Sequence, residues 1–193
     1  MGTEKMSKSL GNVTLVHDLL EKNDGETLRL ALIKASHRNE LGWTDDLLFE
    51  AEEQLDGWYR SLKAIGSVVP SKPAPEMIKA IMDDLSTPKA LFVLSELGKN
   101  LNYNYVEPFD FEQAAAELIA SANLLGLLQK DPEAWFKGGA SSDDQAEFDA
   151  IAKRREVARA AKDWAAADAA RDEATAKGIV LEDGPDGTTW RKA

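Results

Sequence analysis

Residues 44–62 read TDDLLFEAEEQLDGWYRSL, and this stretch decides the fold class. Thr44 is a typical helix N-cap, and the two aspartates after it favour the positive end of a helix dipole. Behind them, apolar side chains recur at steps of three and four residues and so share one helical face. The members of that face are Leu47, Leu48, Ala51, Leu55, Trp58, Tyr59 and Leu62. The stretch predicts a long amphipathic helix that places Trp58 and Tyr59 in a core rather than at a ligand.

Helical patterns continue on both sides of this stretch, from Val13 to about Leu128. The proline-rich residues 70–75 interrupt them, because a helix interior does not accommodate proline. Ser86-Thr87-Pro88 is typical of a helix start. We predict a mainly α fold, with an antiparallel bundle of four or five helices over residues 13–137.

The composition changes at residues 138–147, a stretch with glycines and serines that we interpret as a linker. Residues 148–162 suit one helix, and Asp163 can cap a second, alanine-rich helix that stops at Gly178. Two short strand-like runs then flank the turn sequence Gly184-Pro185-Asp186-Gly187. Residues 148–193 therefore predict a small α+β module, a helical hairpin followed by a short β-hairpin.

Composition excludes several classes of protein. The chain has 193 residues and no cysteine, so it has neither disulfides nor a cysteine-type zinc site, and His17 and His37 are too few for a histidine metal site. No apolar run reaches the roughly 20 residues of a membrane span, and residues 1–12 lack the apolar core of a signal peptide. We expect a cytoplasmic protein with no metal site and no membrane partner.

Charge is unevenly placed along the chain. The net charge is −11, of which residues 13–151 carry −13, while the two ends carry +1 each. Such an acidic middle argues against broad binding to phosphates, which needs a basic face. A local site at either end stays open.

The first candidate site is the segment Lys5-Met6-Ser7-Lys8-Ser9 within residues 1–12. Lysine suits a point charge on phosphate oxygens, and serine hydroxyls add hydrogen bonds. On composition alone, a solvated basic end explains these residues as well. As a literal string, however, the segment resembles the Lys-Met-Ser-Lys-Ser signature of class I aminoacyl-tRNA synthetases.

Other segments narrow this resemblance to the bacterial cysteinyl-tRNA synthetases. They follow the order of that family from Glu4 to Trp190: Asp24-Gly25-Glu26-Thr27-Leu28-Arg29, Asp83-Asp84-Leu85-Ser86-Thr87-Pro88, Asp163-Trp164-Ala165-Ala166-Ala167-Asp168 and Gly178-Ile179-Val180-Leu181-Glu182-Asp183-Gly184-Pro185. The resemblance covers the carboxy-terminal half of the family. It implies a catalytic Rossmann half, with a zinc site and an ATP motif, before Lys5, and a DALR-type tRNA-binding bundle over residues 13–137.

The resemblance also implies functions for the first segment. Lys8, with Lys5, would stabilise charge on ATP as cysteinyl-adenylate forms, and Ser7 and Ser9 would help to bind ATP. ATP and zinc belong to the parent enzyme, and we expect neither to be bound by this chain alone. The expected partners are tRNA-Cys and the catalytic half of the same enzyme.

The second candidate site is in the end module, at Arg159, Trp164, Asp168 and Asp183. An arginine, an aromatic ring and two carboxylates suit the reading of unpaired bases, and in the resemblance these positions match residues that contact the anticodon. Simpler interpretations are that Trp164 packs within the helical hairpin, that Asp163 only caps a helix and that Asp168 pairs with Arg171. Expected phosphate contacts are Arg154, Arg155, Arg191 and Lys192.

Two alternatives stay open. The chain could be a freestanding, inactive RNA-binding paralogue, which the DNA before the Met1 codon would reveal, or an acidic helical interaction module that no longer binds RNA. Mycothiol-pathway ligases share the cysteine-activating fold but recognise no tRNA, and the end hairpin with Trp164 and Asp183 weighs against them.

Overall fold

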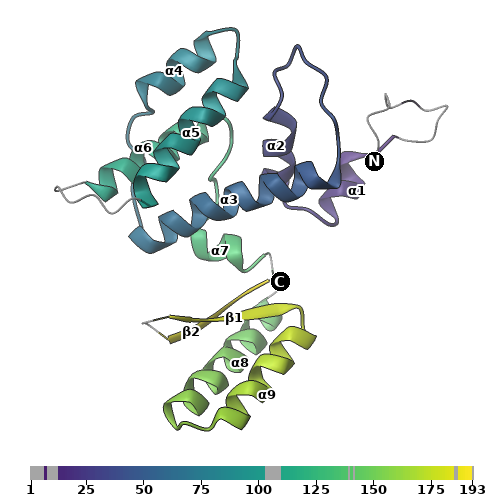
Figure 1. Cartoon of the computed structure of the whole chain (residues 1–193), viewed down its shortest axis with the longest axis vertical. Helices are drawn as coiled ribbons and strands as arrows, with labels where there is room; N and C mark the ends of the chain where they lie inside the picture. Colours follow the sequence, from purple (N-terminus) through teal and green to yellow (C-terminus); the bar gives the residue numbers. More distant parts are fainter. Residues whose placement is uncertain are drawn as a thin grey trace. The chain divides into compact units, whose positions relative to one another are not determined.

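The computed structural model describes residues 7, 13–102, 110–138, 140, 142–184 and 187–192 (Figure 1). These residues are mostly helical, with one antiparallel sheet of two strands near the carboxyl end, which confirms the predicted fold class. The chain divides into two units, Met1–Gln129 and Lys130–Ala193. In the described part of the chain, the helices are too short or too polar to cross a bilayer.

The first unit is a bundle built around the long amphipathic helix. Its elements are α1 (Val16–Leu20), α2 (Gly25–Ile33), α3 (Asp45–Ile65), α4 (Pro75–Met82), α5 (Thr87–Asn102) and α6 (Phe111–Asn123). The Thr44 hydroxyl accepts a hydrogen bond from the Leu47 amide at 3.1 Å, which confirms the predicted cap of α3. The described residues of this unit hold six helices rather than the predicted four or five, because the short α1 and the Asp24-capped α2 are separate helices.

The core of the first unit lies between α3 and the helices α2, α5 and α6 that pack on it. Trp58 and Tyr59 are both buried, as predicted. A side chain at Gly98 would bring a Cβ atom to 2.6 Å from the Trp58 indole, so glycine lets α5 approach α3 closely at this point.

A buried carboxylate joins distant parts of this core. Glu26, at the start of α2, is 6% exposed and accepts hydrogen bonds from the Tyr59 hydroxyl at 2.9 and 3.0 Å. It also accepts bonds from the backbone amides of Leu128 and Gln129, each at 2.9 Å. Since a buried carboxylate is stable only when its oxygens are satisfied, this set of bonds fixes the segment after α6 against α2 and α3.

Replacement of Tyr59 by phenylalanine tests this network. The substitution keeps the ring but removes one donor from a buried carboxylate, so we expect the free energy of unfolding to fall by about 1–3 kcal/mol in urea titrations. Ser61→Ala is the matched control, since its buried hydroxyl bonds only uncharged partners and its loss should cost about 1 kcal/mol or less. A Tyr59→Phe variant as stable as the parent chain would contradict this interpretation.

The second unit contains α7 (Pro132–Phe136), α8 (Ser142–Ala160), α9 (Trp164–Ala176), β1 (Ile179–Gly184) and β2 (Gly187–Lys192). Helix α8 begins at Ser142, so residues 142–147 are helical rather than part of the predicted linker at 138–147. Asp143 and Asp144 lie in the first turn, where their negative charges interact favourably with the positive end of the helix dipole. A serine followed by aspartates is common both in linkers and at helix starts, which is why the composition misled.

A tight turn closes the α8–α9 hairpin. The Lys162 amide donates to the Arg159 carbonyl at 3.0 Å, and the Asp163 amide donates to the Ala158 carbonyl at 2.9 Å. With Lys162 in a left-handed conformation at φ 57°, this is a Schellman motif. The Asp163 carboxylate also accepts a bond from the Ala166 amide at 3.0 Å and so caps α9, as predicted. Asp163 therefore ends one helix and begins the next.

The β-hairpin packs on this helical pair, β1 against α9 and β2 against α8 (Figure 1). Its register pairs Leu181 with Trp190 and Asp183 with Thr188. Trp190 is buried against Phe148 of α8, with ring centroids 4.9 Å apart. Because side chains alternate along a strand, Asp183 lies on the same face as Ile179 and Leu181 and faces the helices. Pro185 and Asp186 of the predicted turn lie outside the described residues.

Candidate functional site

The first candidate site cannot be compared with the structure in detail. Lys5, Lys8 and Ser9 lie outside the described residues, and Ser7 is described without them. The functions expected for these four residues stay predictions.

The second candidate site is organised around the carboxylate of Asp183. Arg155 donates to both of its oxygens, from Nη2 to Oδ2 at 2.8 Å and from Nε to Oδ1 at 3.3 Å. Arg159, one helical turn further along α8, brings Nη1 to 2.7 Å from Oδ1. The Thr188 hydroxyl donates to the same Oδ1 at 2.8 Å. Two arginines of α8 and the paired strand position on β2 thus converge on one carboxylate of β1, and we call these four residues the Asp183 cluster.

The electrostatics of the Asp183 cluster favour the charged forms of Asp183 and Arg155. The hydrogen bonds from Arg155 outweigh the effect of burial and, with Thr188 and the charge of Arg159, hold the pKa of Asp183 down to about 2. The same contact raises the pKa of Arg155, although burial opposes it. With two guanidiniums and one carboxylate, the cluster carries a net positive charge in an otherwise acidic chain.

Trp164 and Asp168 lie on the surface of α9. Trp164 is the first residue of that helix and is 62% exposed, so it does not pack inside the helical hairpin. Asp168 pairs with Arg171 at 3.3 Å, as its simpler interpretation expected, and more than half of each side chain is exposed. Exposed pairs of this kind contribute only about 0.2–1 kcal/mol and are readily exchanged for another partner.

The four residues expected to contact phosphate all have partners within the chain. Arg154 donates to both carboxylate oxygens of Glu173 at 2.8 Å, and Arg191 pairs with Glu182 at 2.7 Å. Lys192 donates to the Gly138 carbonyl at 3.2 Å, and Arg155 holds Asp183. These cations already have partners within the chain, so a contact with phosphate would share or replace those partners, and their function as phosphate contacts stays a prediction. Arg155 and Arg159 are four residues apart, so they lie on the same face of α8. This spacing was the signal in the sequence that Arg155 could contact the same group as Arg159.

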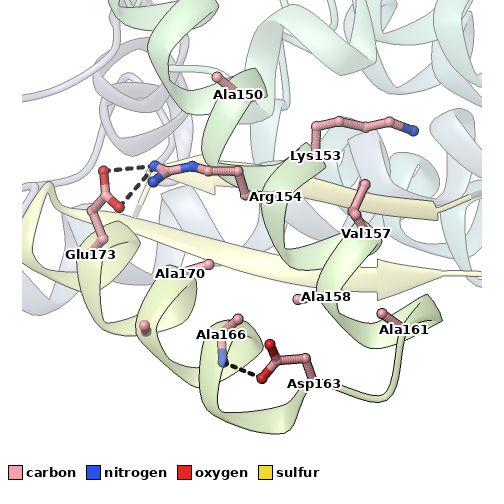
Figure 2. Close-up of a pocket in the computed structure, with 11 residues that line it drawn as sticks. Ala150, Lys153, Arg154, Val157, Ala158, Ala161, Asp163, Ala166, Ala170 and Glu173 are labelled. Carbon is pink, nitrogen blue, oxygen red and sulfur yellow. Dashed lines mark hydrogen bonds and ion pairs between the residues drawn. The ribbon is translucent and has the colours of Figure 1, made fainter.

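A groove between α8 and α9 lies apart from the Asp183 cluster. Figure 2 shows its lining of small side chains, the Arg154–Glu173 pair and the bond from the Ala166 amide to Asp163. Its lining residues do not include Arg155, Arg159, Trp164 or Asp183. Among the described residues, no group of three or more histidine, aspartate and glutamate side chains is placed to hold a metal ion.

Three family models match successive parts of the chain. The model of the class I (C) tRNA synthetase catalytic domain matches residues 1–53, and a DALR domain model matches residues 76–129. The model of the cysteinyl-tRNA ligase anticodon binding domain matches residues 142–191 and so begins where α8 begins.

Curated relatives match the chain from end to end. Proteins named cysteine–tRNA ligase are 48% identical in Maricaulis maris and 47% identical in Parvibaculum lavamentivorans, each over 100% of this chain, and 44% identical in Aliivibrio fischeri over 98% of it. The chain spans 42% of the length of each of these relatives. These matches confirm the resemblance found from the sequence.

The pKa of Asp183 leads to a test by pH. Because it is about 2, below the ordinary 3.8, the charged carboxylate stabilises the folded state above pH 4 and loses this effect as the pH falls towards 2. We expect Asp183→Asn to lower the free energy of unfolding by on the order of 2 kcal/mol at pH 7, and the difference to shrink to nearly zero at pH 2. Urea unfolding of both proteins across this range measures it, and a pH-independent difference would contradict it.

Proposed function

The chain is homologous over its whole length to part of the cysteine–tRNA ligases, and from this premise we propose that it is the tRNA-binding part of such an enzyme and reads the anticodon of tRNA-Cys. The family models support tRNA binding as its general function. Attachment of cysteine to tRNA-Cys, through a cysteinyl-adenylate made from ATP, is the proposed reaction of the complete enzyme.

The observation that carries the proposal is the Asp183 cluster, which joins the two strands to α8 of the helical hairpin that also exposes Trp164. A carboxylate accepts hydrogen bonds from the amino groups of bases, and a guanidinium donates to a guanine edge. An exposed indole offers a surface on which an unpaired base can stack. Asp168, whose pair with Arg171 is exposed, supplies a second carboxylate on the same hairpin.

This arrangement explains how an acidic chain would bind RNA. With a net charge of −11, the protein as a whole does not attract phosphates, and Arg154 and Arg191 are neutralised by acidic partners. Contacts to base edges would therefore supply the selectivity, and affinity would depend less steeply on salt than in a strongly basic protein.

For the reaction of the complete enzyme, we propose that Lys5 and Lys8 stabilise charge on the phosphates of ATP, with Ser7 and Ser9 adding hydrogen bonds. A zinc site that selects a thiol substrate does not fit this chain, because the sequence contains no cysteine. We therefore assign no zinc-dependent step to its residues.

Binding to RNA tests the proposal. At fixed salt, we expect the chain to bind the anticodon stem-loop of tRNA-Cys at least tenfold more tightly than the same stem-loop with a changed anticodon. Trp164→Ala should weaken this binding about five- to a hundredfold, since stacking contributes roughly 1–3 kcal/mol per base, whereas Trp164→Phe should keep most of it. Asp183→Ala should abolish the selectivity.

Lys153→Gln is the control for this measurement, because it removes an exposed cation of α8 that pairs with Glu156 and contacts neither the Asp183 cluster nor Asp168. Its preference for the anticodon of tRNA-Cys should stay within about twofold of the parent chain. Equal affinity of the parent chain for both stem-loops would contradict anticodon reading by this chain.

A second prediction concerns catalysis. We expect the chain alone to give no ATP–pyrophosphate exchange with cysteine, because the resemblance assigns the thiol-selecting zinc site and the main ATP motif to residues outside it. A full-length cysteine–tRNA ligase is the positive control. Exchange above background with the chain alone would overturn this prediction.

A further inference from the structure

Arg155 is held in one orientation by three elements of the second unit. From α8 it donates to both oxygens of Asp183 on β1, and through Nη1 it donates to the Ala167 carbonyl of α9 at 3.1 Å. Only 13% of its side chain is exposed. A planar guanidinium with donors engaged on two sides has little freedom to turn, so Arg155 is poorly placed to reach a ligand itself.

Arg159 contacts the same carboxylate through fewer atoms and is more exposed to solvent than Arg155. It approaches only Oδ1, and 44% of its side chain is exposed, compared with 25% for Asp183. Thr188 Oγ1 and Arg155 Nε donate hydrogen bonds to Oδ1, which has two lone pairs, so Arg159 meets this oxygen as an ion pair rather than through a third hydrogen bond. Arg159 is therefore the partner that Asp183 loses most easily.

We propose that Arg155 is a positioning residue for base recognition, which keeps Asp183 paired and oriented while Arg159 moves from that carboxylate to a base. The inference rests on the proposed function in anticodon reading and assigns separate functions to two neighbouring arginines. Arg155 acts through Asp183, and Arg159 contacts the RNA. Oδ2, whose described partner is Arg155 Nη2, keeps a lone pair for an amino group of a base.

The energetic reason is the cost of an unpaired charge in a partly buried site. Removing the only partner of such a carboxylate is strongly unfavourable, so a lone Arg159 would be held in place by Asp183. With Arg155 present, the carboxylate keeps a charged partner when Arg159 leaves. Loss of Arg155 should therefore lock Arg159 onto Asp183 and remove base selectivity from a chain that still folds.

Arg155→Gln, with Arg154→Gln as its control, tests the proposal in the full chain. Arg154 is the adjacent residue of α8 and also pairs with two carboxylate oxygens, but those of Glu173, away from the Asp183 cluster. The measured quantity is the ratio of the Kd for the stem-loop with a changed anticodon to the Kd for the tRNA-Cys stem-loop, at one salt concentration. We expect Arg155→Gln to lower this ratio at least tenfold and Arg154→Gln to change it less than twofold.

The ratio separates positioning from a general loss of structure. A variant that only unfolds more readily binds both stem-loops less well by the same factor, so its ratio does not change. Arg155→Lys serves as a second variant that keeps the charge if Arg155→Gln does not fold. Its single ammonium cannot reproduce the three contacts, and we expect the ratio to fall at least threefold.

Two outcomes would overturn the inference, and they differ. A folded Arg155→Gln or Arg155→Lys variant with the ratio of the parent chain would remove Arg155 from base recognition and leave the proposed function intact. A parent chain with a ratio of one would remove the proposed function itself, and this inference with it.

Discussion

The structure of the second unit depends on the carboxylate of Asp183, which pairs with the guanidiniums of both Arg155 and Arg159. Its apolar core is small and consists mainly of Phe148, Ile151, Ile179 and Trp190 with a few alanines. Beyond that core, Asp183 ties β1 to α8 through Arg155 and Arg159, and Arg155 ties α8 to α9 through the Ala167 carbonyl. The polar contacts that hold the β-hairpin on the helices are thus also the groups with the chemistry to read a base.

The pairing of basic side chains with carboxylates is common throughout the second unit. Basic side chains are numerous there, but Arg154, Arg155, Arg171 and Arg191 each lie within 3.3 Å of a carboxylate oxygen. A surface neutralised in this way attracts nucleic acid weakly at long range, so under the proposed function the exchange of internal partners for RNA partners would determine what binds. Such exchange favours discrimination between bases over raw affinity.

Much of the fold follows from short-range patterns, whereas the site required long-range contacts. Thr44, Asp163 and Gly178 mark helix ends by local rules, and the three- and four-residue steps of α3 correctly place Trp58 and Tyr59 in the core. The pairing of Arg155 with Asp183 joins residues 28 positions apart, and Glu26 binds amides 102 and 103 positions away. No local spacing encodes such pairs, because the register of β1 on the helices decides the first and the packing of the segment after α6 against α2 decides the second. The sequence therefore indicated Arg159 and Asp183 as candidate site residues, but it did not indicate that Arg155 and Thr188 hold Asp183.

The most direct test of the account is an NMR titration of the whole chain with the anticodon stem-loop of tRNA-Cys. If the Asp183 cluster reads the bases, the largest shifts will be at the Trp164 indole N–H and the Nε–H of Arg159, with smaller shifts at Arg155. The methyl groups of Val157 and of the alanines in the α8–α9 groove will then stay nearly unchanged. Shifts confined to that groove, with Trp164 and Arg159 unaffected, would contradict the account.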